Sequence, residues 1–121
     1  RVGKGLNDEA KSIRDSKIMI LGVAYKKDID DMRESPALSI RKLLKFKGAT
    51  VSFHDPYVKN IDKEKSLELN VKNIENQDAI VITTDHSNVD YELIGKHAKL
   101  IIDTRNVMAN IKNPNARVLR A

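Results

Sequence analysis

Short apolar runs alternate with longer amphipathic stretches along this chain, and this alternation is the main guide to its fold. Residues 17–23 read KIMILGV, an apolar run that is typical of a strand buried on both faces of a parallel sheet. Further strands are predicted at residues 49–54, 78–83 and 99–104, and Val118 with Leu119 fits a last edge strand.

Helical segments lie between these runs. The spacing predicts a helix over Pro36–Lys47, with Ser35 as its N-cap, Pro36 at its first position and Gly48 as its stop signal. The predicted apolar side of this helix consists of Ala37, Ile40, Leu43 and Leu44.

Three other segments have weaker patterns. Residues 91–97 predict a helix around Leu93 and Ile94, and residues 7–14 are compatible with one. The polar, asparagine-rich stretch 59–76 predicts a short helix plus loop. Strands alternating with helices indicate an α/β fold: a doubly wound, mainly parallel, Rossmann-like sheet with helices on both faces.

The first strand ends in Gly22 but is not followed by G-x-G-x-x-G. A full dinucleotide-binding half uses that motif to hold a pyrophosphate, so the predicted sheet lacks this cradle. Residues 25–34, which are crowded with charge, are instead predicted to form a loop. In an open α/β sheet such a loop lies at the carboxyl ends of the strands, where ligands bind.

Composition narrows the function classes. The chain of 121 residues contains no cysteine, which excludes a disulfide framework, a thiolate metal site and a cysteine nucleophile within it. Apolar runs fall short of the roughly 20 residues of a membrane span, and residues 1–11 lack the apolar core of a signal peptide, so we expect a soluble, cytoplasmic domain with no membrane partner.

The net charge of +5 favours anionic partners. The positive residues are scattered, and Arg41, Lys42 and Lys45 fall on the polar face of the predicted helix, where a solvated surface is the ordinary explanation. With three tyrosines, two phenylalanines and no tryptophan, none interleaved with basic runs, nucleic-acid binding is not expected. Anionic small molecules are the better partners.

Several motifs resemble those of one family. Gly22, Ala24, Tyr25, Lys26 and Asp28 match a G-x-[AF]-[FY]-K-x-[DN] loop; Asp31, Arg33, Ser35 and Pro36 match D-x-R-x-S-P; and Asp55 with Pro56 matches a DP after the second strand. In this order and spacing, they resemble the C-terminal domain of the UDP-glucose/GDP-mannose dehydrogenase family. Residues 80–86 and 100–106 match its closing strands.

The resemblance implies an organisation. Residues 1–16 would be the end of an inter-domain helix and residues 17–121 the UDP-sugar-binding domain. In the family, an N-terminal domain carries the dinucleotide fingerprint and the catalytic cysteine lies upstream of this segment. The resemblance thus implies NAD bound mainly outside this chain, a parent oxidoreductase that is a homo-oligomer, contact with its remaining domains, and no oxidation by this chain alone.

Family roles carry over to four residues. Tyr25, Lys26 and Arg105 would bind the UDP-sugar, and Arg33 would bind the cofactor's phosphates across the domain cleft. Each of the four also has a purely structural explanation. Tyr25 could pack on the sheet edge and Lys26 could be solvated. Arg105 could satisfy strand-end carbonyls, and Arg33 could pair with Asp30 or Asp31. Asp103 and Asn106 are expected to shape the loop at Arg105, and Ser35 to act only as a cap.

Asp85 and His86 follow the third strand and could suggest general-base or metal chemistry. No third ligand or orienting partner stands at a usable spacing, so we predict no catalytic residue and no metal site. The run from Thr83 to Ile94 is more similar to the TDH-S-x-x-DY pattern of UDP-N-acetylhexosamine dehydrogenases than to that of UDP-glucose dehydrogenases. It favours UDP-N-acetylglucosamine as the parent substrate, with UDP-N-acetylmannosamine next.

One rival is a stand-alone nucleotide-binding or receiver-like module without enzymatic activity, with Asp55 as phosphoacceptor. Against it, a turn-forming proline follows Asp55 and no acidic pair directly follows the first strand. The dehydrogenase interpretation makes a geometric prediction. Lys26, Arg33, Asp55, Asp85 and Arg105 should all emerge at one edge of the sheet, although they are far apart in sequence.

Overall fold

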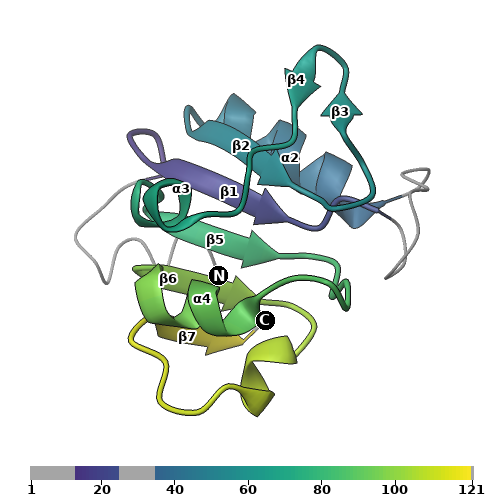
Figure 1. Ribbon diagram of the computed structural model, residues 1–121. Helices are drawn as coiled ribbons and strands as arrows, with labels where there is room; N and C mark the ends of the chain where they lie inside the picture. The colour runs from purple at the N-terminus through teal and green to yellow at the C-terminus, as the bar shows by residue number, and fades with distance from the viewer. Residues whose placement is uncertain (1–12, 25–34, 121) are drawn as a thin grey trace.

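A five-stranded parallel sheet forms the centre of the molecule (Figure 1). The computed structural model describes residues 13–24 and 35–120. The strand order is β2-β1-β5-β6-β7, and every neighbouring pair is parallel. The strands are β1 (Lys17–Leu21), β2 (Thr50–His54), β5 (Ala79–Ile82), β6 (Leu100–Asp103) and β7 (Arg117–Arg120).

Helices cover both faces of this sheet. Helix α2 (Pro36–Phe46) lies behind the sheet in Figure 1, whereas α3 (Val71–Glu75) and α4 (Tyr91–His97) lie in front of it. A 3₁₀ helix, η1 (Val107–Asn110), follows β6. The predicted fold class, a doubly wound Rossmann-like sheet, is confirmed.

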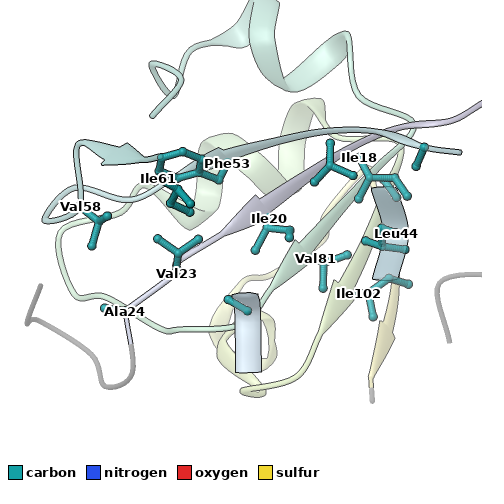
Figure 2. Close-up of a cluster of buried hydrophobic side chains, with 14 of the residues drawn as sticks. Ile18, Ile20, Val23, Ala24, Leu44, Phe53, Val58, Ile61, Val81 and Ile102 are labelled. Atoms are coloured by element: carbon teal, nitrogen blue, oxygen red, sulfur yellow. The ribbon is translucent and has the colours of Figure 1, made fainter. Parts of the chain in front are cut away.

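Strand β1 is apolar at every position after Lys17, and its packing shows why. Ile18 and Ile20 pack in one core with α2 and β2 (Figure 2), whereas Met19 and Leu21 pack in a second core with α3 and α4. All four side chains are fully buried. Both faces of the strand are therefore covered, which removes the polar alternation of a strand with one wet face.

Helix α2 begins as predicted and ends one residue earlier. Ser35 Oγ accepts a hydrogen bond from the backbone N–H of Ala37 at 3.3 Å, and Pro36 stands at the first helical position. One part of the predicted apolar side is wrong, because Leu43 is 54% exposed. Ala37 and Leu44, two helical turns apart, are the residues that α2 buries, and Leu43 is turned about 100° away from Leu44.

The stretch 59–76 contains structure that its sequence did not predict. A small antiparallel hairpin, β3 (Asn60–Ile61) and β4 (Glu64–Lys65), precedes the expected short helix α3. Glu64 lies near two cations of α2, 3.6 Å from Arg41 and 3.5 Å from Lys45, so these two are not simply solvated. Two-residue strands are too short to produce a recognisable alternation, which is why this hairpin was missed.

The amino-terminal prediction falls mostly on residues 1–12, which lie outside the described residues. Residues 13–15 form a bend and turn rather than the end of a helix, closed by a hydrogen bond from Ser16 N to Ile13 O at 3.1 Å. Within 13–24 and 35–120, no helix is long and apolar enough to cross a membrane.

Candidate functional site at the carboxyl ends of the strands

The strand ends bring together residues that are distant in sequence. Because β2, β1, β5 and β6 are parallel neighbours, the segments that follow them leave the sheet at the same edge. Asp55, Asp85 and Arg105 follow β2, β5 and β6, so the predicted convergence holds for these three.

Four predicted residues of this edge cannot be placed in the same way. Tyr25, Lys26 and Arg33, with their neighbour Asp31, lie outside the described part of the chain. The described residues that flank them are Ala24, just beyond β1, and Ser35, at the start of α2. The chain passes from β1 to β2 on one side and then to β5 on the other, which makes the β1–β5 boundary the topological switch point of this sheet.

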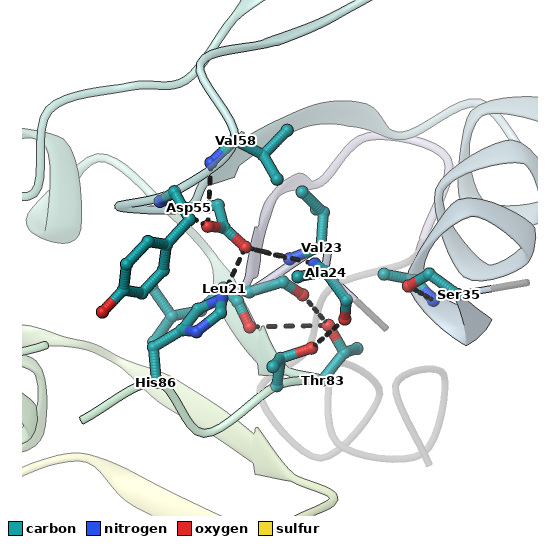
Figure 3. Close-up of polar contacts among 12 residues, drawn as sticks. Leu21, Val23, Ala24, Ser35, Asp55, Val58, Thr83 and His86 are labelled. Carbon is teal, nitrogen blue, oxygen red and sulfur yellow. Dashed lines mark hydrogen bonds and ion pairs between the residues drawn. The ribbon is translucent and has the colours of Figure 1, made fainter. Parts of the chain in front are cut away.

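Asp55 connects the ends of β2 and β1 (Figure 3). Its Oδ2 accepts hydrogen bonds from the backbone N–H groups of Val23 at 2.8 Å and Ala24 at 3.2 Å. Its Oδ1 accepts from those of Tyr57 at 2.8 Å and Val58 at 3.1 Å. The side chain of Asp55 is fully buried and all these partners are donors, which suits an acceptor-only carboxylate.

His86 completes this arrangement and corrects the prediction that it has no orienting partner. Its Nε2 lies 2.8 Å from Asp55 Oδ2, and the residue is fully buried. Because the carboxylate can only accept, Nε2 carries the hydrogen of this bond. The ring of Tyr57 packs at 4.9 Å, centroid to centroid, from the imidazole. The pair was missed because 31 residues separate its members, and only the strand order brings them together over the end of β1.

Two threonines hold the other side of the β1 exit. Thr83 Oγ1 donates to the carbonyl oxygen of Gly22, and Thr84 Oγ1 donates to that of Ala24 at 2.6 Å. Gly22 has φ +85°, and a Cβ added to it would lie 2.5 Å from the carbonyl oxygen of Thr84. The exits of β1 and β5 are therefore joined too closely for any side chain at residue 22.

The contact at Gly22 also bears on whether the end of β1 could hold the pyrophosphate of an NAD cofactor. In a dinucleotide cradle, glycines after the first strand let the backbone approach a pyrophosphate. Here, the close approach at Gly22 is occupied by Thr83 and Thr84 of the same chain. The described residues at the end of β1 do not fit such a cradle, in agreement with the missing glycine motif.

Arg105 lies at the β6 exit and is exposed. Its Nε donates to the carbonyl oxygen of Thr83 at 3.0 Å, so Arg105 does satisfy a strand-end carbonyl, as its purely structural explanation predicts. Asp103 holds the loop: its Oδ1 accepts from Arg105 N at 3.0 Å and its Oδ2 from Met108 N at 2.8 Å. Asn106 adopts φ +59° and precedes η1, so both expected loop-shaping residues have that role.

The edge thus presents a hydrogen-bonded cation beside strand exits that are joined by hydrogen bonds. Anchoring through Nε fixes the plane of the guanidinium while its residue stays exposed, which suits a phosphate or another planar oxyanion. Asp55 is an unsuitable phosphoacceptor, because it is buried and both its oxygens are hydrogen-bonded. No group of three metal-ligating side chains occurs among the described residues.

A hollow lies beside α4. A groove of about 510 Å³ runs between α4 and the segment that connects η1 to β7, and Glu92, Lys96, Asn110 and Lys112 are among its lining residues. It is a rival location for a ligand on geometric grounds alone. None of the motif residues of the sequence lies in it.

The fold and the edge define a Rossmann-like α/β domain whose ligand edge carries an oriented arginine. Residues 19–110 match the family model described as "UDP-glucose/GDP-mannose dehydrogenase family, UDP binding domain". The chain belongs to this family and corresponds to its UDP-binding domain.

Relatives and solved structures agree. The chain is 44% identical over 102 residues to UDP-N-acetyl-D-mannosamine dehydrogenase of Pyrococcus horikoshii, covering 80% of this chain and 22% of that protein. It is 36% identical over 110 residues to UDP-glucose 6-dehydrogenase of Rickettsia bellii, covering 81% and 25%. The chain spans about a quarter of the length of these curated relatives.

Among solved structures, UDP-D-ManNAc dehydrogenase from Pyrococcus horikoshii superposes with a TM-score of 0.75 at 33% identity, over 97% of this chain and 28% of that one. NDP-N-acetyl-D-galactosaminuronic acid dehydrogenase from Methanosarcina mazei Go1 gives a TM-score of 0.77 at 29% identity, over 97% and 26%. The chain is thus similar in sequence and in fold to one part of nucleotide-sugar dehydrogenases.

Proposed function

We propose that this chain binds the UDP moiety of a nucleotide sugar at the carboxyl edge of its sheet, as the substrate-binding part of an NAD-dependent nucleotide-sugar 6-dehydrogenase. The observation that carries the proposal is Arg105, exposed beyond β6 and held through Nε by the carbonyl oxygen of Thr83. An oriented guanidinium at this edge suits a diphosphate.

The family resemblance supplies the other contacts of the proposal. Tyr25 and Lys26 bind the UDP-sugar from the segment that follows β1, and Arg33 reaches the phosphates of NAD. NAD itself is held mainly by another domain of the parent enzyme, since the residues at the end of β1 do not fit a pyrophosphate cradle.

The parent reaction is the oxidation of the C6 alcohol of a UDP-hexose to the uronic acid. The similarity to UDP-N-acetyl-D-mannosamine dehydrogenases favours UDP-N-acetylmannosamine over UDP-N-acetylglucosamine, the sugar that the sequence pattern placed first. Residues 17–121 are then the UDP-sugar-binding domain, and residues 1–16 are the segment that joins it to the rest of the parent enzyme, with any inter-domain helix ending before the bend at residues 13–15. The parent enzyme is a homo-oligomer.

The test is titration calorimetry of this chain with UDP. We expect wild-type chain to bind, and Arg105→Ala to weaken binding about tenfold or more, because it removes a charge-assisted contact to phosphate. Lys42→Ala is the matched control: it removes one positive charge from the exposed surface of α2 and should leave the affinity within about twofold.

Two results would contradict the proposal. One is the absence of UDP binding to wild-type chain. The other is an equal loss from Arg105→Ala and Lys42→Ala, which would indicate diffuse attraction by net charge. In a parallel assay with NAD and UDP-N-acetylmannosamine, this chain should form no NADH, since it contains no cysteine nucleophile.

A further inference from the structure

The exit of β1 is held by hydrogen bonds from both of its neighbours. On the β2 side, Asp55 accepts from the N–H groups of Val23 and Ala24. On the β5 side, Thr83 and Thr84 donate to the carbonyl oxygens of Gly22 and Ala24. Val23 and Ala24 are buried away from water, so these protein groups supply the partners that their backbone needs and determine its path.

The Asp55–His86 pair forms the buried part of this arrangement. His86 is fully buried and Asp55 is 3% exposed, so neither side chain is available to a ligand in this structure. The pair also joins the β5 exit to the β2 exit over β1, because His86 Nε2 lies 2.8 Å from Asp55 Oδ2. Tyr91 also holds the β5 exit, because its Oη donates a hydrogen bond to the backbone oxygen of His86 at 2.8 Å.

Thr83 links this arrangement to Arg105. Its hydroxyl donates to Gly22 O at the β1 exit, while its own carbonyl accepts from Arg105 Nε. The position of the β1 exit and the orientation of the arginine are thus connected through one residue. A displacement of the β1 exit would disturb the acceptor that holds the guanidinium.

We propose that Asp55 and His86 are a positioning pair for the UDP site. They set where the backbone leaves β1 and, through Thr83, how Arg105 is held, without touching the ligand. This inference rests on the proposed function, and it adds two residues that act on affinity from beneath the site. Their loss should weaken UDP binding by the folded chain, beyond any effect on stability.

The substitutions are chosen by donor and acceptor chemistry. Asp55→Asn replaces one oxygen by an NH₂ donor, so at least two backbone N–H groups face another donor in either amide orientation. His86→Leu removes the Nε2 donor, whereas His86→Gln retains an N–H donor at a similar reach. The matched control is Asp78→Asn, because Asp78 Oδ2 accepts from Lys17 N at 2.8 Å, at the opposite end of β1.

UDP affinity is measured by calorimetry at a temperature where circular dichroism shows each variant to be folded, and the Tm of each variant is recorded separately. We expect Asp55→Asn and His86→Leu to weaken UDP binding about tenfold, and His86→Gln and Asp78→Asn to stay within about threefold of wild type. If Asp55→Asn does not fold, the His86→Leu and His86→Gln comparison carries the test.

The outcomes separate the two proposals. If Asp55→Asn and His86→Leu lower the Tm but bind UDP as tightly as wild type, the pair is only structural and the positioning role is overturned, while the UDP site stands. If His86→Gln loses as much affinity as His86→Leu, the hydrogen bond is not what positions the site. If the wild-type chain binds no UDP, the proposed function fails and the positioning role fails with it.

Discussion

At the residue scale, two glycines share a left-handed backbone conformation but differ in how closely other atoms approach them. Gly22 has φ +85° and Gly48 has φ +93°. A Cβ on Gly22 would lie 2.5 Å from the backbone oxygen of Thr84, whereas one on Gly48 would lie 3.1 Å from the Cγ of Arg14. The first distance is shorter than Cβ contacts in folded proteins, so the β5 exit would have to shift. The second, with the backbone Cα of Arg14 at 3.3 Å, needs a movement of only a few tenths of an ångström.

We therefore expect Gly22→Ala to lower the free energy of unfolding by more than about 2 kcal/mol, from backbone strain plus a steric clash. Gly48→Ala should cost about 1 kcal/mol, because the left-handed conformation is strained but the contact with Arg14 is relieved by a small shift. Urea denaturation of both variants measures the difference. Equal losses would show that the contact with Thr84 is not restrictive.

At the scale of elements, the strands and helices that could be predicted from the sequence are those with runs of buried residues or with local capping residues. Strands β1, β5 and β6 were predicted within two residues at each end because their buried positions are consecutive and, apart from Asp103 at the end of β6, apolar. Helix α2 was predicted from Ser35, Pro36 and Gly48, whose roles are local and need no tertiary contact. The hairpin β3–β4 and helix η1 were not predicted, since they are too short to show a period.

The N-cap of α2 can be tested within the same helix. Ser35 Oγ accepts from Ala37 N, whereas Ser39 is exposed in the helix interior. Ser35→Ala should lower the free energy of unfolding by about 1 kcal/mol, because it leaves a buried helix end without its cap. Ser39→Ala should leave stability unchanged or raise it slightly, since alanine is the better helix former. Thermal unfolding of the two variants decides this, and a larger loss for Ser39→Ala would contradict it.

At the scale of the whole molecule, the site is built from residues that lie far apart in the sequence, so no local pattern reveals that they meet. Arg105 and its loop neighbours were recognisable as a motif after a strand, but the Asp55–His86 pair requires knowing that β1 separates β2 from β5. The strand order is a global property of the fold. The sequence could therefore predict at which edge of the sheet Asp55, Asp85 and Arg105 lie, but not which buried residues hold that edge in place.

Of the two phenylalanines in the chain, one lies in the core and the other on the surface, which allows the effect of burial to be compared. Phe53 in β2 is fully buried, and Phe46 at the end of α2 is 88% exposed. Phe53→Ala should destabilise by about 3 to 5 kcal/mol through lost burial and a cavity. Phe46→Ala should change stability by no more than about 0.5 kcal/mol. Chemical denaturation measures both, and a large loss for Phe46→Ala would show that its side chain is covered in solution.

The central claim is that the ligand binds at the carboxyl edge of the sheet, and mapping UDP on the amide NMR spectrum tests it most directly. The account predicts that chemical shifts change at Val23, Ala24, Thr84 and Arg105, around the exits of β1, β5 and β6. Lys17 and Asp78 at the opposite edge, and Lys96 and Lys112 in the groove beside α4, should remain unchanged. Shift changes concentrated in that groove or at the amino edge, with Thr84 and Arg105 unaffected, would contradict it.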